Sequence, residues 1–123
     1  MENGEVPRYV ILEHEGLRDR HWDFMLESGP ALRTWALGGA PQAGERLAAE
    51  ALGDHRIEYL DYQGQVSGGR GTVARWDQGT YELLAESESE LQVRLSGQRL
   101  EGVATLRRCA AERWEFVLAE NPG

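Results

Sequence analysis

The chain has 123 residues, 41% of them apolar, with four tryptophans, one cysteine and a formal net charge of −8. This length suits a single domain, and the apolar content favours a folded globular protein over a disordered one. One cysteine excludes an internal disulfide and a cysteine-rich zinc site. The acidic balance disfavours a protein that coats nucleic acid, but all 13 basic residues are arginines, which can hold a single phosphate bidentately.

The ends of the sequence carry no targeting pattern. The N-terminal residues lack the basic and apolar regions of a signal peptide, and no apolar run approaches the length of a membrane span. We therefore expect a cytoplasmic protein without a membrane partner. Residues 1–7 are expected to form a short arm and residues 8–123 a single domain.

The first two expected strands carry most of the candidate chemistry. Residues 8–13 are typical of a buried strand, which delivers His14 at its end. Residues 21–27 alternate between apolar and polar, so His21 and Asp23 share one strand face. A hairpin would return His14 beside them, and two imidazoles with a carboxylate suit a divalent transition metal with open positions. Because the motif is short, a solvated strand face is the simpler alternative.

The middle of the chain is less regular. Residues 31–37 are expected to form a strand, whereas 45–52 have helical composition but are short, so a strand and one or two helical turns both stay open. Residues 53–62 contain the third histidine. There His55 and Tyr59 share a face in an extended segment and also meet in a helical turn.

The second half of the sequence indicates a series of short strands. A glycine-rich loop at 63–71 contains Arg70 and would let the backbone approach a ligand closely, or would simply be a flexible hairpin loop. A tight turn is expected at Gln78-Gly79. Strands spaced eight to twelve residues apart predict an all-β barrel or sandwich. They are expected at 72–77, 80–85, 90–95, 102–107 and 113–119, with Trp35, Trp76 and Trp114 in the core.

Four motifs stand in order along the chain: RHWDFMLE at 20–27, RTWAL at 33–37, ERLAAEALGDHRIEY at 45–59 and GGRGTVARWDQGTYE at 68–82. In this order they resemble the 3′-phosphoesterase domain of bacterial DNA ligase D and its stand-alone relatives. Each motif alone is weak, but the ordered series is specific, and the likeness extends over about residues 8–119.

The resemblance implies a mainly β fold: a compact antiparallel β-barrel with one or two short helices and a manganese site at one end. It also implies an enzyme of DNA repair that removes a terminal ribonucleotide or a 3′-phosphate from nucleic-acid 3′ ends. The hydroxyl left behind would serve a DNA ligase or polymerase of the same pathway. Another divalent first-row metal could replace manganese.

Individual residues carry over by position. The resemblance implies metal ligands at His14, His21 and Asp23, a contact to the scissile phosphate from His55 with Tyr59 beside it, and a phosphate contact from Arg46. Taken alone, His55 could instead close a turn, and Tyr59 could be an amphipathic residue of the barrel rim.

The sequence also departs from the family pattern. An arginine of the family is Met25 here, and a lysine falls at residues 38–39, which are glycines. Loss of a charged contact to a transition-state phosphate usually costs on the order of 10²–10³ in rate. Arg70, or Arg18 and Arg20, are the candidates to replace the missing cations.

These departures leave alternatives beside the leading hypothesis of a metal-dependent phosphoesterase. A catalytically weakened or inactive relative could bind ends or a repair partner, which the absent cations and the acidic charge support. An iron oxygenase with two histidines and one carboxylate is a third possibility. A metal-content assay combined with oxygen uptake would distinguish it.

Overall fold

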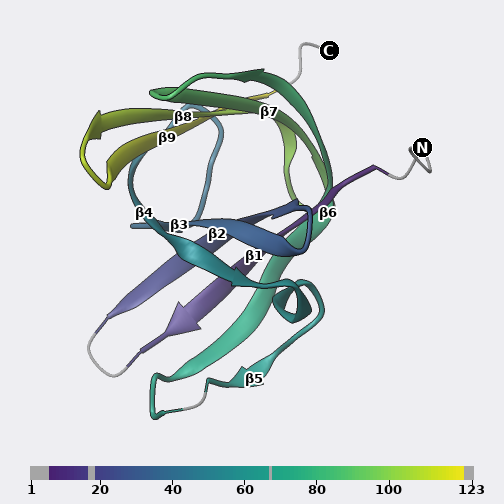
Figure 1. The fold of residues 1–123 in the computed structure, drawn as a ribbon, viewed down its shortest axis with the longest axis vertical. Coiled ribbons are helices and arrows are strands. Elements are labelled where there is room, and N and C mark those ends of the chain that lie inside the picture. The colour runs from purple at the N-terminus through teal and green to yellow at the C-terminus, as the bar shows by residue number, and fades with distance from the viewer. Residues whose placement is uncertain (1–5, 17–18, 67, 121–123) are drawn as a thin grey trace.

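The computed structural model describes residues 6–16, 19–66 and 68–120. Its strands form one sheet in the order β1-β2-β3-β4-β9-β8-β7-β6-β5, and β1 also pairs with β6. That last pairing closes eight strands into an antiparallel barrel and leaves the short β5 as an addition beside β6 (Figure 1). The expected β-barrel is therefore confirmed.

The observed elements agree closely with the expected ones in the first half of the chain and less closely in the second half, where one strand replaces two expected strands. The described residues contain one helix, the 3-10 helix η1 (Ile57–Leu60). The strands are β1 (Arg8–Glu15), β2 (Arg20–Ser28), β3 (Ala31–Leu37), β4 (Arg46–Arg56), β5 (Gly64–Gln65), β6 (Thr72–Glu86), β7 (Glu90–Gly97), β8 (Glu101–Ala110) and β9 (Arg113–Glu120). The ambiguous segment at 45–52 is thus strand, because it lies within β4.

The tight turn expected at Gln78-Gly79 is wrong. Strand β6 runs through both residues without a break, and they pair with Val10 and Tyr9 of β1. A Cβ on Gly79 would overlap the Ser96 carbonyl oxygen of β7. Glycine at this position therefore permits a close approach of neighbouring strands rather than a reversal of the chain.

The barrel interior is a single apolar core. The alternation expected for β2 is present, because Phe24 and Leu26 face this core, where the Phe24 and Phe116 rings meet edge-on with centroids 5.4 Å apart. Trp35 is buried in the same core, and Trp76 and Trp114 pack against it, as their expected role requires. The buried residues of this core are Tyr9, Ile11, Phe24, Leu26, Trp35, Leu37, Ala49, Leu91, Val93, Leu95, Leu100, Ala104, Leu106, Phe116 and Leu118.

A second apolar cluster lies on the outer face of the β1–β2 hairpin. The chain between β4 and β6, which includes η1 and β5, folds back over this face (Figure 1). Residues from both sides meet there: Val10, Leu12, Met25, Leu32, Leu60, Val66 and Val73. The hairpin is therefore covered on both faces, and the polar residues near its turn border this second cluster. No helix among the described residues has the length and apolarity to cross a membrane.

Candidate functional site

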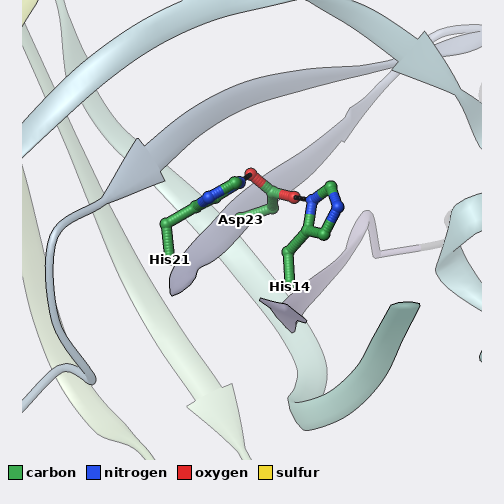
Figure 2. Close-up of side chains that lie close together, drawn as sticks. All are labelled: His14, His21 and Asp23. Atoms are coloured by element: carbon green, nitrogen blue, oxygen red, sulfur yellow. Dashed lines mark hydrogen bonds and ion pairs between the residues drawn. The ribbon is translucent and has the colours of Figure 1, made fainter. Parts of the chain in front are cut away.

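The outer face of the β1–β2 hairpin brings two imidazoles and a carboxylate together. His14 pairs across the ladder with His21, and Leu12 with Asp23. One candidate ligand atom from each of the three polar residues lies within 4.8 Å of the others. Figure 2 shows the Asp23 carboxylate between the two rings, with one oxygen turned toward each histidine. The strand alternation and the hairpin predicted this meeting.

The inner nitrogens of the two rings face the carboxylate at close range. His14 Nδ1 lies 3.2 Å from Asp23 Oδ2, and His21 Nε2 lies 3.1 Å from Asp23 Oδ1. Ligands about 2.1 Å from a first-row metal and at right angles to one another lie about 3.0 Å apart. The two histidine–carboxylate spacings are therefore compatible with adjacent ligands of one metal, although each histidine faces a different carboxylate oxygen.

The outer nitrogens of both rings already have partners. His14 Nε2 lies 2.8 Å from the carbonyl oxygen of Arg70, and His21 Nδ1 lies 3.2 Å from Asp19 Oδ2. Both partners are acceptors, so each outer nitrogen donates, and in a neutral ring the inner nitrogen then carries a lone pair. Histidines that bind metals are held in the same way, with the second ring N–H donated to a carboxylate or carbonyl.

The Asp23 carboxylate faces the inner nitrogens of the two histidines, which donate to it only when they carry a proton. Asp23 is 3% exposed, and its Oδ1 accepts no well-aligned hydrogen bond from the described residues. A buried charge is costly unless it is paired and hydrogen-bonded. Three lone-pair-bearing atoms that face one another require a proton or a cation between them. The donor set and its one orphaned oxygen therefore fit a divalent first-row metal.

The same carboxylate changes the titration of His21. Its contact with Asp23 raises the pKa of His21 above the ordinary value, burial acts in the opposite direction, and Asp19 raises the pKa further. A metal must displace the proton from the inner nitrogen to bind there. Binding is therefore expected to weaken in acid.

The outer hydrogen bond of His14 depends on a glycine in the loop before β6. Gly71 has a φ of +96°, and a Cβ there would overlap the carbonyl oxygen of Glu15 at the end of β1. Glycine adopts this conformation without steric cost and allows the two backbones to approach. The approach brings the Arg70 carbonyl onto His14. The glycine-rich loop therefore contacts a candidate metal ligand through its backbone.

A cavity of about 380 Å³ opens beside the cluster, and three further candidate residues, His55, Tyr59 and Arg70, line it. His14 and Asp23 line one side, and His55 and Tyr59 from the end of β4 and from η1 line another. The His55 and Tyr59 rings meet edge-on with centroids 6.0 Å apart. His55 Nδ1 lies 2.9 Å from the Gly53 carbonyl oxygen and donates to it, which leaves Nε2 for other partners.

A family model described as the DNA Ligase D 3′-phosphoesterase domain matches residues 12–108. The chain belongs to this family. Multifunctional non-homologous end joining protein LigD of Pseudomonas aeruginosa is 30% identical over 129 residues, which cover 93% of this chain and 15% of that protein. The multifunctional non-homologous end joining DNA repair protein LigD of Mycobacterium tuberculosis is 32% identical over 120 residues, covering 90% and 16%. The chain thus spans about one-sixth of the length of these relatives.

Met25, which stands where the family has an arginine, lies at the cavity. Met25 is 1% exposed, belongs to the outer apolar cluster and borders the cavity. Arg70 borders the same cavity, and so does Arg56. Two arginines from other segments therefore border the same cavity as Met25, the position that lacks the family arginine.

Two of these neighbours had not been singled out from the sequence. Arg56 directly follows His55 at the end of β4, and Asp19 stands two residues before His21. Closeness in sequence to a candidate histidine is the pattern that would have identified both. It is a weak pattern for Arg56, because successive residues of a strand normally face opposite sides.

Other predicted residues lie apart from the cavity. Arg46 is at the opposite end of β4, with its Nε 3.7 Å from Glu115 Oε2, and it borders a different hollow. Nine residues of extended strand span up to roughly 30 Å, which separates Arg46 from His55. Its phosphate role stays a prediction. Arg20 pairs with Glu13 and borders a hollow on the other side of His21, whereas Arg18 lies outside the described residues.

Proposed function

We propose that the chain is a metal-dependent phosphoesterase that removes a 3′-phosphate or a terminal ribonucleotide from nucleic-acid 3′ ends. The observation that carries this proposal is the buried Asp23 carboxylate between two histidines whose outer nitrogens are already bonded. Membership of the 3′-phosphoesterase family supports the choice of substrate. The names of the relatives connect those proteins with non-homologous end joining and DNA repair.

His14 through Nδ1, His21 through Nε2 and the Asp23 carboxylate would hold a manganese ion or another divalent first-row metal. When bound, such a metal supplies charge neutralisation at a phosphate oxygen. Three protein ligands leave coordination positions open toward substrate. The Asp19 carboxylate and the Arg70 carbonyl keep the two rings in the ligating tautomer.

The remaining cavity residues would serve the phosphate and the leaving group. His55 in its protonated form would donate from Nε2 to the leaving oxygen, because Nδ1 is engaged with Gly53. Tyr59 packs edge-on against the imidazole and would restrain its orientation. Arg56 and Arg70 border the cavity and would hold phosphate oxygens in place of the missing family arginine.

The product of the proposed reaction indicates which partners would act after this protein. Removal of a 3′ block leaves a hydroxyl, which a DNA ligase or polymerase of the same repair pathway would use. A net charge of −8 is compatible with this role, because only one phosphate at a strand end must be held.

The experiment is incubation of the purified protein with primers ending in a 3′-phosphate or a 3′-ribonucleotide, with Mn²⁺ or with excess chelator. We expect release that depends on Mn²⁺ and is lost in His21→Ala and Asp23→Ala. Glu82→Gln, which changes an exposed carboxylate on β6, is the matched control. Activity that persists in chelator or in both alanine variants would show that the site is misplaced. End binding without release would favour the weakened or inactive relative.

A further inference from the structure

A second, smaller cavity adjoins the one beside the metal cluster. Its volume is about 220 Å³, and its lining residues are Arg56, Glu58, Tyr59, Tyr62 and Gln65. Arg56 and Tyr59 border both cavities. A ligand held by its phosphate in the first cavity could therefore extend past these two residues into the second.

One wall of the smaller cavity is an ordered aromatic surface. The Tyr59 and Tyr62 rings meet edge-on, with centroids 5.6 Å apart and planes at 88°. Tyr62 is 39% exposed, yet its hydroxyl donates to the Gln65 carbonyl oxygen, which fixes the ring. Nucleobases stack on exposed aromatic rings of this kind. A ring that is both exposed and held in place is suited to receive a base.

The charges around the smaller cavity select the kind of occupant. Glu58 places a carboxylate in the lining, which disfavours a second phosphate there. A carboxylate accepts hydrogen bonds and can receive those of ribose hydroxyls. Arg56 stands where the two cavities meet and can pair with a phosphate. The volume is below the roughly 300–1,000 Å³ of drug-sized sites, so it suits one nucleoside rather than a length of strand.

We propose that the smaller cavity is the subsite for the terminal ribonucleoside on the 3′ side of the scissile phosphate. Its base would lie against Tyr62 and its ribose hydroxyls would reach Glu58. This inference rests on the proposed function, since it takes the phosphate to lie in the first cavity. The leaving group belongs on this side because His55, the proposed donor to the leaving oxygen, packs against Tyr59, which forms part of both linings. Water would add to the phosphorus as the bond to the 5′-oxygen of the ribonucleoside breaks, and this oxygen would take the proton. The primer would then carry a 3′-phosphate, whose removal in a second hydrolysis leaves the hydroxyl.

The kinetic test compares two primers in Tyr62→Ala and in Tyr62→Trp. Stacking of one base contributes about 1–3 kcal/mol, and 1.4 kcal/mol corresponds to tenfold. Tyr62→Ala should therefore lower kcat/KM about tenfold on a 3′-ribonucleotide primer and less than twofold on a 3′-phosphate primer, which has no nucleoside beyond the phosphate. Tyr62→Trp should restore the loss. An equal loss on both primers, or no loss on either, would overturn the proposal.

A further comparison addresses Glu58 and the sugar. Glu58→Gln should reduce the preference for a 3′-ribonucleotide over a 3′-deoxynucleotide, because a neutral amide is a weaker acceptor than a carboxylate. Leu83→Ala, an exposed change on β6, is the control for any general effect of substitution. An unchanged preference in Glu58→Gln would remove the ribose contact from the proposal.

A binding measurement separates the subsite from the chemistry. Adenosine 5′-monophosphate, titrated into the protein and followed by backbone amide NMR, should shift the Glu58 and Tyr62 resonances of the wild type. In Tyr62→Ala its affinity, followed through the Glu58 resonance, should be about tenfold weaker. Ribose 5-phosphate, which lacks the base, should leave Tyr62 unshifted. Equal shifts from both compounds would overturn the subsite. Absence of primer cleavage together with these shifts would count against the proposed reaction and not against the subsite.

Discussion

Asp77 and Asp23 are both buried, at 1% and 3% exposure, but their surroundings differ in one decisive respect. Asp77 lies inside the barrel and accepts hydrogen bonds from the Tyr9 hydroxyl at 2.5 Å, the Arg99 amide at 2.8 Å and the Leu100 amide at 3.2 Å. Asp23 lies on the outer face between two imidazole nitrogens, which donate to it only when they carry a proton. The fold satisfies Asp77 with permanent donors, whereas Asp23 requires either a protonated histidine or a metal cation.

The partners of the two carboxylates reinforce this difference. Burial raises the pKa of Tyr9 far above its ordinary value, and the hydrogen bond to Asp77 raises it further, so the phenol stays a donor at any ordinary pH. The histidines beside Asp23 can instead bind a metal through an unprotonated imidazole nitrogen. Burial of a carboxylate alone therefore does not identify a functional site; the supply of donors around it does.

The largest expected effect is that of Asp23→Ala on activity. We expect a loss of roughly 10³-fold or more, because the metal contributes several kcal/mol of transition-state stabilisation. In the metal-free protein, at a pH above the raised pKa of His21, the free energy of unfolding should change by less than about 1 kcal/mol, since the variant then removes a buried charge that no protonated histidine balances. Primer cleavage and urea unfolding measure the two quantities. A large loss of metal-free stability would make Asp23 a structural residue like Asp77.

Asp77→Ala should have the opposite profile. Three buried donors lose their acceptor, at about 1–3 kcal/mol for each unsatisfied group, so we expect the free energy of unfolding to fall by at least about 3 kcal/mol. Activity per folded molecule should stay within about twofold. Urea unfolding of Asp77→Ala beside Asp61→Ala, which removes an exposed carboxylate, provides the comparison. A loss below about 1 kcal/mol would contradict the structural role.

Met25→Arg tests whether the site lacks a cation. The change should raise the cleavage rate by about tenfold, which recovers part of the 10²–10³ that a missing charged contact costs. The melting temperature should fall, because Met25 is buried in the outer apolar cluster and an arginine stem must replace it there. Met25→Leu keeps the packing and is the control. An unchanged rate in a folded Met25→Arg variant would indicate that Arg56 and Arg70 already supply the charge.

Asp19→Asn is expected to have the smallest effect on metal binding, and it acts through His21. Loss of an outer partner should weaken Mn²⁺ binding about tenfold at neutral pH. It also removes one of the interactions that raise the pKa of His21, so the acid loss of Mn²⁺ should move to lower pH. Mn²⁺ affinity measured across pH 5 to 8 tests both effects. If the wild type and Asp19→Asn lost Mn²⁺ with the same pH midpoint, Asp19 would not contribute to the raised pKa of His21.

The raised pKa of His21 also fixes the sign of a stability effect. In the metal-free protein its protonated form is stabilised by folding, so this contribution is complete below the ordinary pKa of about 6.5 and is lost as pH rises through the raised value. The metal-loaded protein should behave in the opposite way, because binding requires the neutral ring. Thermal unfolding at several pH values, with and without Mn²⁺, should therefore give opposite slopes.

The sequence predicts the parts of the site that follow from strand periodicity. The alternation of residues 21–27 places Phe24 inside the barrel and Asp23 outside, because period-two patterning identifies opposite strand faces. The place of His14 follows from the hairpin register. Contacts from distant segments could not be predicted in this way, and Arg56 and the Arg70 carbonyl reach the site through the folding of η1, β5 and their loops.

Two further differences between the expected and the observed elements arise from long-range strand pairing. Residues 45–52 have a composition compatible with helix, and only their pairing with β3 and β9 makes them strand, which moves Arg46 away from His55. Gly79 suits a turn and a close strand approach equally well, so the unbroken β6 depends on its long-range pairing with β1 and β7. In both cases tertiary contacts decide between two conformations that the local sequence allows.

His14, His21 and Asp23 are proposed to hold one metal ion together, and Asp77 is expected to take no part in binding it. Titration of the metal-free protein with Mn²⁺, followed through the electron paramagnetic resonance signal of the free ion, distinguishes the two carboxylates. We expect one bound Mn²⁺ per chain in the wild type and in folded Asp77→Asn, and loss of binding in Asp23→Ala and His14→Ala. Equal binding by the wild type and Asp23→Ala would show that Asp23 does not bind the metal.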